Sequence, residues 1–161
     1  MKIAIIGAGY VGLTSAAVFA EKGHIVRIID SDIGKIEKLK SGETLFFEPA
    51  LPELIGKNIK NKKLIPELGI GESINSVDAI FICVGTPTQK DGECDLTQVF
   101  SAAKEIGKNL KNRCVIVMKS TVPVGTTEKM AKIIKEQTTA EIEVASCPEF
   151  LREGSAIKNT L

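Results

Sequence analysis

The sequence predicts an α/β fold in which helices cover both faces of a doubly wound, mostly parallel sheet. Short stretches that are apolar almost throughout alternate with longer stretches that have helical spacing of apolar residues. Continuous apolar character is typical of parallel strands, because a layer of helices buries each face of the sheet. A glycine-rich turn directly after the first strand is the mark of a Rossmann-type domain. The 161 residues are enough for one such domain.

The strands are expected where apolar runs end in glycine or in polar turn residues. The first, "KIAIIG", runs straight into a glycine turn, and the second, "HIVRIID", ends on an acidic residue. Three more follow at spacings that leave room for a helix between each pair. The expected strands are 2–7, 24–30, 79–85, 114–120 and 141–147.

Helices are expected between these strands. Ser31 or Asp32 can cap the second helix, because a short polar side chain accepts hydrogen bonds from the first free amides. Gly42 would end that helix, and Asp95 stands at the start of the next one. The expected helices are 11–22, about 32–40, 95–110 and 126–137.

Segment 43–77 is less regular than the rest of the chain. Its motif "FFEPALPEL" contains two prolines and predicts one short helix. The basic run "KNIKNKK" at 57–63 is interpreted as a solvated loop.

Composition excludes several classes of partner. A net charge of +1, from 21 basic and 20 acidic residues, gives no reason to expect nucleic acid or an anionic membrane. No apolar run approaches the ~20 residues of a membrane helix, and "MKIAIIG" lacks the features of a signal peptide. A cytoplasmic location is therefore expected.

The thiol and imidazole groups do not form a metal-site pattern. The cysteines are spaced 11, 20 and 33 residues apart, and the sequence has a single histidine, His24. Cys83 and Cys114 lie in apolar runs and are expected to be buried.

The motif "GAGYVG" follows the first strand and opens the first helix. Gly7 would permit the tight turn, Gly9 would let the backbone approach a pyrophosphate, and Gly12 would allow close contact between helix and strand. The amides and positive dipole of the helix N-terminus favour phosphate. The sequence therefore predicts a dinucleotide site, although FAD uses the same fingerprint as NAD.

Asp30 bears on the choice of dinucleotide. It ends the second strand 23 residues after Gly7, where an acidic side chain is expected to bind the ribose 2′-hydroxyl. Such a carboxylate repels a 2′-phosphate, so NAD is favoured over NADP. Lys35 lies close enough in sequence to reach the adenosine end of the cofactor and to reduce the preference for NAD over NADP.

Three further strand ends carry polar side chains. Thr86 and Thr88 follow the third strand, Ser120 and Thr121 follow the fourth, and "CPEFLREGSA" follows the fifth. Each alone is compatible with ordinary turn chemistry. Parallel strands bring their carboxyl ends to one edge, however, so these loops are expected to converge on one crevice. A carboxylate there can accept a proton if it lies within ~3 Å of the group it serves.

Five motifs in this order resemble those of the UDP-glucose/GDP-mannose dehydrogenase family: "GAGYVG", "FFEPALPEL", "VGTPT", "KSTVPVGTT" and "PEFLREGSA". The resemblance covers essentially the whole chain. It implies a two-step oxidation of UDP-glucose to UDP-glucuronate with reduction of two NAD⁺. Oxidation of GDP-mannose or UDP-N-acetylmannosamine remains open, as does a stand-alone NAD-binding module without catalysis.

The resemblance also implies roles for individual residues. Glu149 would act as acid and base, and Thr121 would position a water near the nicotinamide. Cys147 stands where the family often has asparagine, but nothing basic adjoins it and it is not expected to be a nucleophile. The expected cofactor residues are Gly7, Gly9, Tyr10, Val11, Gly12, Asp30, Lys35, Thr86, Thr88, Ser120, Thr121 and Glu153. The expected substrate residues are Glu149, Phe150, Leu151, Arg152 and Glu153.

The family's catalytic cysteine has no counterpart among these four cysteines. The resemblance implies that it lies beyond residue 161, together with a substrate-binding domain and a central helix that forms a homodimer. Residues 1–161 are therefore expected to be the N-terminal NAD-binding domain of a larger enzyme. Alone, they are expected to bind NAD weakly and not to oxidise UDP-glucose.

Overall fold

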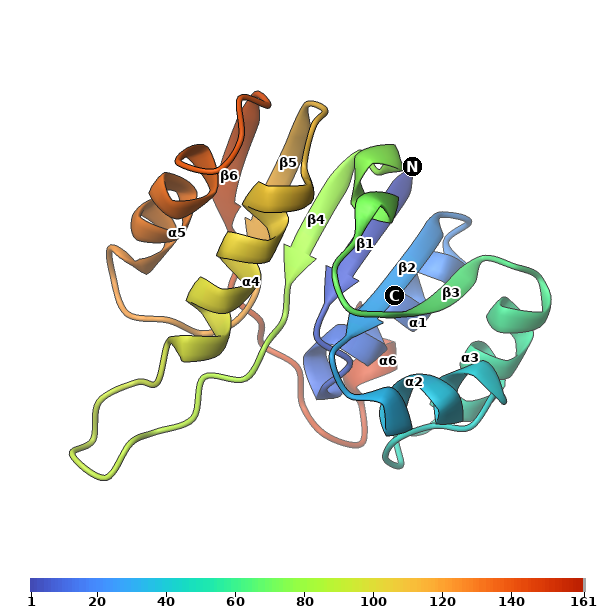
Figure 1. The fold of residues 1–161 in the computed structure, drawn as a ribbon. Coiled ribbons are helices and arrows are strands. Elements are labelled where there is room, and N and C mark those ends of the chain that lie inside the picture. The colour runs from blue at the N-terminus through green and yellow to red at the C-terminus, as the bar shows by residue number, and fades with distance from the viewer. Residues whose placement is uncertain (161) are drawn as a thin grey trace.

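Six parallel strands form one sheet, with helices on both of its faces (Figure 1). A computed structural model describes residues 1–160. The strand order is β3-β2-β1-β4-β5-β6, so the chain moves outward from β1 in one direction and then returns to build the other half. This confirms the predicted Rossmann-type fold. The strands are β1 Lys2–Ile6, β2 Ile25–Asp30, β3 Leu64–Leu68, β4 Ala79–Ile82, β5 Cys114–Met118 and β6 Ile142–Ser146.

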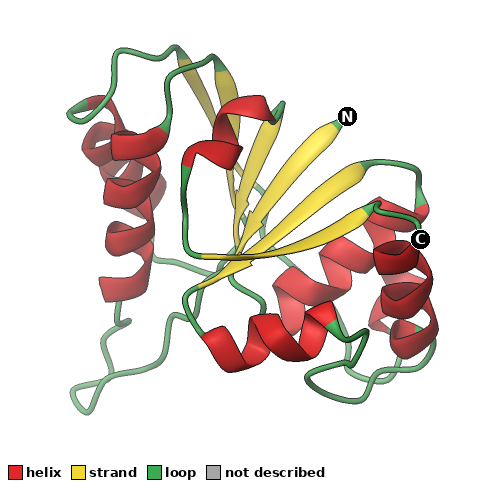
Figure 2. Cartoon of the chain, turned by 45° about the vertical axis from the view of Figure 1, so that its right-hand side comes forward, coloured by secondary structure: helices red, strands yellow, loops and turns green. Residues whose placement is uncertain are grey.

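The helices divide into two layers (Figure 2). Side chains of α4, α5 and η1 pack into one apolar cluster with the sheet, and side chains of α1, α2, α3 and α6 pack into a second cluster. Both faces of the sheet are thereby covered, as the continuous apolar strands require. The helices are α1 Tyr10–Glu21, α2 Ile33–Lys40, α3 Leu51–Lys60, η1 Glu72–Ser76, α4 Thr97–Asn109, α5 Thr126–Lys135 and α6 Ala156–Thr160.

Local sequence signals fix several of these boundaries. Asp32 caps α2, and its carboxylate accepts hydrogen bonds from the amides of Gly34 and Lys35. Asp95 accepts a hydrogen bond from the Thr97 amide at the start of α4. The two cysteines expected to be buried, Cys83 and Cys114, are buried.

Segment 43–77 is more ordered than its sequence suggested. It contains α3, the strand β3 and the short helix η1, where only one short helix was expected. Pro66 lies within β3 and cannot donate a ladder hydrogen bond, which weakened the strand signal. The structure accommodates this proline because β3 is at an edge of the sheet.

The interpretation of 57–63 as a solvated loop is wrong for its first half. Residues 57–60 form the last turn of α3. The Asn58 side chain is buried and donates hydrogen bonds to a Glu21 carboxylate oxygen at 3.1 Å and to the Leu54 carbonyl at 2.9 Å. Lys57 pairs with the other oxygen of Glu21 at 2.6 Å. Contacts with α1 therefore stabilise a stretch whose composition alone favoured a loop.

No helix within residues 1–160 has the length and apolar character needed to cross a membrane.

Two substitutions on α2 test the packing of this layer. Leu39 is completely buried, whereas Ile33 is 58% exposed on the same helix. Leu39→Ala should lower the free energy of unfolding by about 2–5 kcal/mol, because it leaves a cavity. The matched control Ile33→Ala should change it by less than about 0.5 kcal/mol. Urea unfolding followed by circular dichroism measures both, and equal effects would contradict this packing.

Candidate functional site

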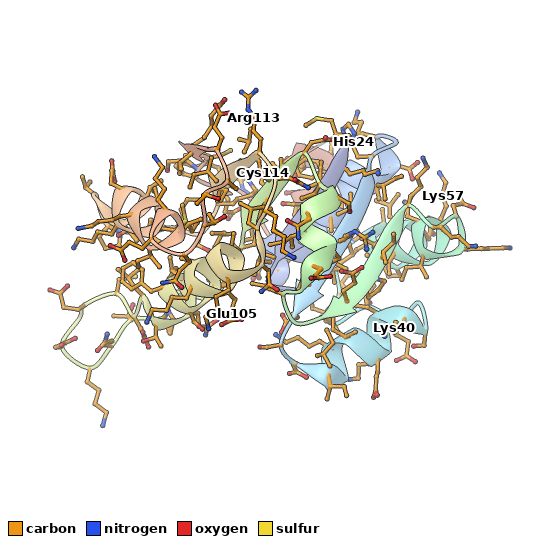
Figure 3. The ribbon with its side chains drawn as sticks, turned by 45° about the horizontal axis from the view of Figure 1, so that its top comes forward. His24, Lys40, Lys57, Glu105, Arg113 and Cys114 are labelled. Carbon is orange, nitrogen blue, oxygen red and sulfur yellow. The ribbon has the colours of Figure 1, made fainter. Side chains whose placement is uncertain are left out.

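All six strands are parallel, so the loops that follow them lie together at the carboxyl ends of the strands. The loops after β1, β2, β4, β5 and β6 carry the predicted site residues. This end of the sheet is called its carboxyl edge. The single histidine is at the other edge. His24 directly precedes β2 and Arg113 directly precedes β5, and Figure 3 shows both on the same side of the molecule. Among residues 1–160, no group of three His, Cys, Asp or Glu side chains has an arrangement that could hold a metal ion. The candidate site is therefore built from glycines, hydroxyls, carboxylates and a few basic side chains.

The three glycines of the first turn differ in what a side chain at each position would meet. Gly7 has φ +101°, and a Cβ there would lie 2.6 Å from the Cys83 carbonyl oxygen. At Gly12 a Cβ would lie 1.9 Å from the Gly7 carbonyl oxygen, so α1 can approach the turn only without a side chain. At Gly9 an added Cβ would meet no atom within 4 Å. Gly9 therefore leaves an open backbone surface at the N-terminus of α1.

Asp30 connects the ends of β1 and β2. One carboxylate oxygen, Oδ2, accepts a hydrogen bond from the Ala8 amide at 2.7 Å and lies 3.3 Å from Lys35 Nζ. The other, Oδ1, accepts from the Asp32 amide at 2.9 Å. The side chain is only 10% exposed. These contacts hold the carboxylate in a fixed orientation beside the glycine turn.

A cavity of about 920 Å³ opens beside this turn. Gly7, Gly9, Asp30 and Lys35 line one side of it. The opposite side is formed by polar residues of α4, which include Glu105, labelled in Figure 3. The volume is in the range of pockets that hold small molecules and cofactors. Four of the predicted cofactor residues thus border one cavity.

The loops after β4 and β5 are tied to each other. Thr86 Oγ1 donates a hydrogen bond to the Thr121 carbonyl at 3.0 Å, and Ser120 Oγ donates to the Val84 carbonyl at 2.7 Å. Thr86, Ser120 and Thr121 are therefore close together, although none of them lines the cavity. Thr88 is in the 85–96 loop, which extends away from the body of the molecule and pairs Thr88 with Cys94 (Figure 1).

The 149–153 segment presents most of its side chains to solvent. Glu149 is half-buried, and its carboxylate accepts a hydrogen bond from the Leu151 amide at 2.9 Å. Phe150 is 89% exposed. Arg152 and Glu153 are exposed, and Arg152 forms no ion pair within residues 1–160. The predicted substrate residues are therefore accessible.

Sequence reasoning missed Glu48, whose side chain is buried behind this segment. Its Oε2 accepts hydrogen bonds from the Tyr10 hydroxyl at 2.7 Å and from the Gly154 amide at 2.8 Å. Its Oε1 accepts from the Ala156 amide at 2.9 Å. The available signal was a lone carboxylate within the apolar motif "FFEPAL", paired with a Gly-Ser-Ala helix start more than 100 residues later.

Burial and hydrogen bonding set the charge states around Glu48. Burial raises the pKa of Glu48, but the hydrogen bonds from Tyr10 and from backbone amides outweigh it, and the pKa is lowered overall. The pKa of Tyr10 is raised by burial first, then by the Glu48 carboxylate, with smaller effects from Glu153 and Glu149. Tyr10 therefore stays a neutral donor and Glu48 a charged acceptor.

Two of the thiols are poor nucleophiles. Burial raises the pKa of Cys83 to about 12 and the pKa of Cys114 to about 11. A thiol in this state is protonated at neutral pH, whereas the thiolate is the nucleophile.

The chain is similar to known proteins over almost its whole length. Residues 1–161 match the UDP-glucose/GDP-mannose dehydrogenase family, NAD binding domain. The UDP-glucose 6-dehydrogenase of Rhizobium meliloti is 47% identical over 161 residues, which are 99% of this chain and 37% of that protein. The chain thus spans little more than a third of the length of this curated relative.

Two solved structures are also similar to the chain. A UDP-glucose dehydrogenase from the hyperthermophilic archaeon Pyrobaculum islandicum is 38% identical with a TM-score of 0.93, over 98% of this chain and 38% of that one. A GDP-mannose dehydrogenase from Pseudomonas aeruginosa is 32% identical with a TM-score of 0.94, over 99% of this chain and 38% of that one.

The lowered pKa of Glu48 predicts an acid-sensitive contribution to stability. Because the pKa in the folded chain lies below the ordinary value of 4.5, the charged carboxylate stabilises the fold above pH 4.5. This contribution is lost as the pH falls through the folded pKa. Urea unfolding at a series of pH values should show wild type more stable than Glu48→Gln near neutral pH, with the difference shrinking in acid. A difference independent of pH would contradict this assignment.

Proposed function

The chain belongs to the UDP-glucose/GDP-mannose dehydrogenase family as its NAD-binding domain, and from this premise we propose that it is the cofactor-binding part of a UDP-glucose 6-dehydrogenase. The proposed reaction converts UDP-glucose, two NAD⁺ and one water to UDP-glucuronate, two NADH and three protons. The observation that carries the proposal is the open backbone at Gly9 and the fixed carboxylate of Asp30 on one cavity, in a chain of this family.

UDP-glucose is favoured over other nucleotide sugars by relative similarity. Among the two solved structures, identity to the P. islandicum UDP-glucose dehydrogenase is 38%, whereas identity to the P. aeruginosa GDP-mannose dehydrogenase is 32%. The latter nevertheless has the same fold at a TM-score of 0.94. GDP-mannose is therefore the second candidate, and UDP-N-acetylmannosamine is a third.

The residues beside the cavity fit NAD. The amides at the N-terminus of α1 would bind the pyrophosphate, which approaches most closely at Gly9. Asp30 would accept a hydrogen bond from a ribose hydroxyl, and its charge would disfavour the 2′-phosphate of NADP. Lys35 already pairs with Asp30, so the Asp30 carboxylate partly neutralises its positive charge. Bound NAD⁺ supplies a hydride acceptor at its nicotinamide ring.

The remaining roles are assigned to the loops at the same edge of the sheet. Glu149 would accept the proton that leaves the sugar hydroxyl, directly or through a water held by Thr121. Arg152 is exposed and unpaired within residues 1–160, so it is free to bind a substrate phosphate. Thr86, Thr88, Ser120 and Glu153 would lie along the cofactor.

We propose that the thiol nucleophile of the second oxidation lies outside residues 1–161. Cys83 and Cys114 are buried and stay protonated at neutral pH. In the longer protein, a substrate-binding domain and a central helix that forms a homodimer would complete the enzyme. Residues 1–161 alone would then bind NAD without catalysing the reaction.

Turnover of the full-length protein tests this proposal. With UDP-glucose it should form two NADH for each sugar consumed, followed at 340 nm as an absorbance increase. Glu149→Gln should lower kcat by roughly 10²–10⁴-fold, the usual range for a general base. The control Glu128→Gln, an exposed carboxylate on α5, should retain activity. Residues 1–161 alone should form no NADH.

Three outcomes would contradict parts of this proposal. Turnover of GDP-mannose but not of UDP-glucose would overturn the substrate. NAD⁺ binding by the full-length protein without any oxidation would favour a binding module. Sustained NADH formation by residues 1–161 alone would overturn the assignment of the nucleophile.

A further inference from the structure

Glu48 is the only charged residue in the described part of the chain whose side chain is buried, at 1% exposure. A buried carboxylate is costly unless hydrogen-bond donors surround it. Here three donors converge on it: the Tyr10 hydroxyl and the amides of Gly154 and Ala156. Removal of the carboxylate would leave buried donors unpaired, and removal of the donors would leave a buried charge unpaired.

These donors come from two parts of the proposed active site. Tyr10 is the first residue of α1, directly after the open backbone at Gly9. Gly154 and Ala156 follow directly after the 149–153 segment, which carries Glu149. Glu48 thus connects the proposed pyrophosphate site with the end of the proposed catalytic segment.

The catalytic segment has few other attachments. At its start, the Cys147 amide donates a hydrogen bond to the Met118 carbonyl at 2.9 Å, which continues the pairing of β6 with β5. Between there and Gly154, the hydrogen bonds found among residues 1–160 are local, such as that from the Leu151 amide to Glu149. Glu48, together with the apolar packing of Ile157 in α6, therefore holds the second end of a loop whose first end is held by β5.

The backbone around Glu48 is itself well determined. Ala50, two residues later, adopts φ +66°, which is uncommon for a residue with a side chain. Such a conformation persists where the surrounding structure over-determines it. Nearby, the ring of Phe46 packs against the ring of Tyr10, with centroids 5.0 Å apart. The Phe46 ring thus adds an apolar contact beside the hydrogen bond between Tyr10 and Glu48.

We propose that Glu48 is a positioning residue for the dehydrogenase reaction, which holds the 149–153 segment in register with the N-terminus of α1. This inference rests on the proposed function, because that function gives Glu149 its role. A displacement of a reacting group by ~1 Å can cost about 100-fold in rate. Loss of the Glu48 contacts should therefore lower kcat, although Glu48 itself touches neither cofactor nor substrate in this assignment.

The test compares Glu48→Gln with wild type in the full-length protein. Hydrogen–deuterium exchange should become roughly tenfold faster at the amides of residues 154–157, because glutamine keeps only one of the two acceptor oxygens that bind Gly154 and Ala156. Exchange in β1 and β4 should not change. With UDP-glucose, kcat should fall about 10-fold to 100-fold, while the Kd for NAD⁺ changes by less than about threefold. Glu53→Gln, an exposed carboxylate on α3, is the matched control and should match wild type.

The outcomes separate this inference from its alternatives. Unchanged exchange at residues 154–157 would overturn it, and so would faster exchange with unchanged kcat, which indicates a purely structural cap. If Glu48→Gln does not fold, Tyr10→Phe removes one donor and keeps the backbone amide, and the exchange and kcat readouts apply with smaller changes. If wild type does not oxidise UDP-glucose, the proposed function fails, and the exchange measurement alone decides whether Glu48 holds the segment.

Discussion

The close approach of the N-terminus of α1 to the end of β1 is the constraint on which the rest of the site depends. Only glycine at position 12 lets the helix lie against the carbonyl of Gly7, and only a positive φ at Gly7 turns the chain sharply enough to start the helix there. The result is a set of free amides beside the centre of the sheet. Because β1 is a central strand, this anion-binding edge lies between the two halves of the fold.

The carboxylates near this anion-binding site are of two kinds, those bonded to backbone amides and those accessible to solvent. Asp30 and Glu48 accept hydrogen bonds from backbone amides, which fix the orientation of both carboxylates. Glu149 and Glu153 remain accessible on the C-terminal segment. The first two carboxylates hold the backbone in place, and the accessible pair, Glu149 and Glu153, can contact a reacting group. The hydrogen bonds to Glu48 lower its pKa despite burial. They also connect this one buried residue with two loops that are distant from it in sequence.

Much of the fold could be predicted from the sequence, because its strands are uninterrupted apolar runs bounded by glycine and polar turns. The strand β3 was missed because Pro66 breaks the pattern, and only its edge position makes that proline acceptable. The end of α3 was taken for a loop because its stability comes from Asn58 and Lys57 contacting Glu21 on another helix. Glu48 was missed for the same reason: Tyr10 is 38 residues away and Gly154 and Ala156 are more than 100 residues away, so no local sequence pattern indicates these hydrogen bonds.

In the proposed site, the first turn binds the pyrophosphate of NAD through backbone amides. Titration of the ¹⁵N-labelled chain with NAD⁺, followed by amide NMR spectra, tests it most directly. The largest shifts should occur at residues 8–12. Gly9→Ala should keep a folded spectrum while losing these shifts, because its Cβ meets no protein atom but would occupy the space that the ligand needs. Saturable shifts confined to another region, or unaltered NAD⁺ binding by Gly9→Ala, would contradict it.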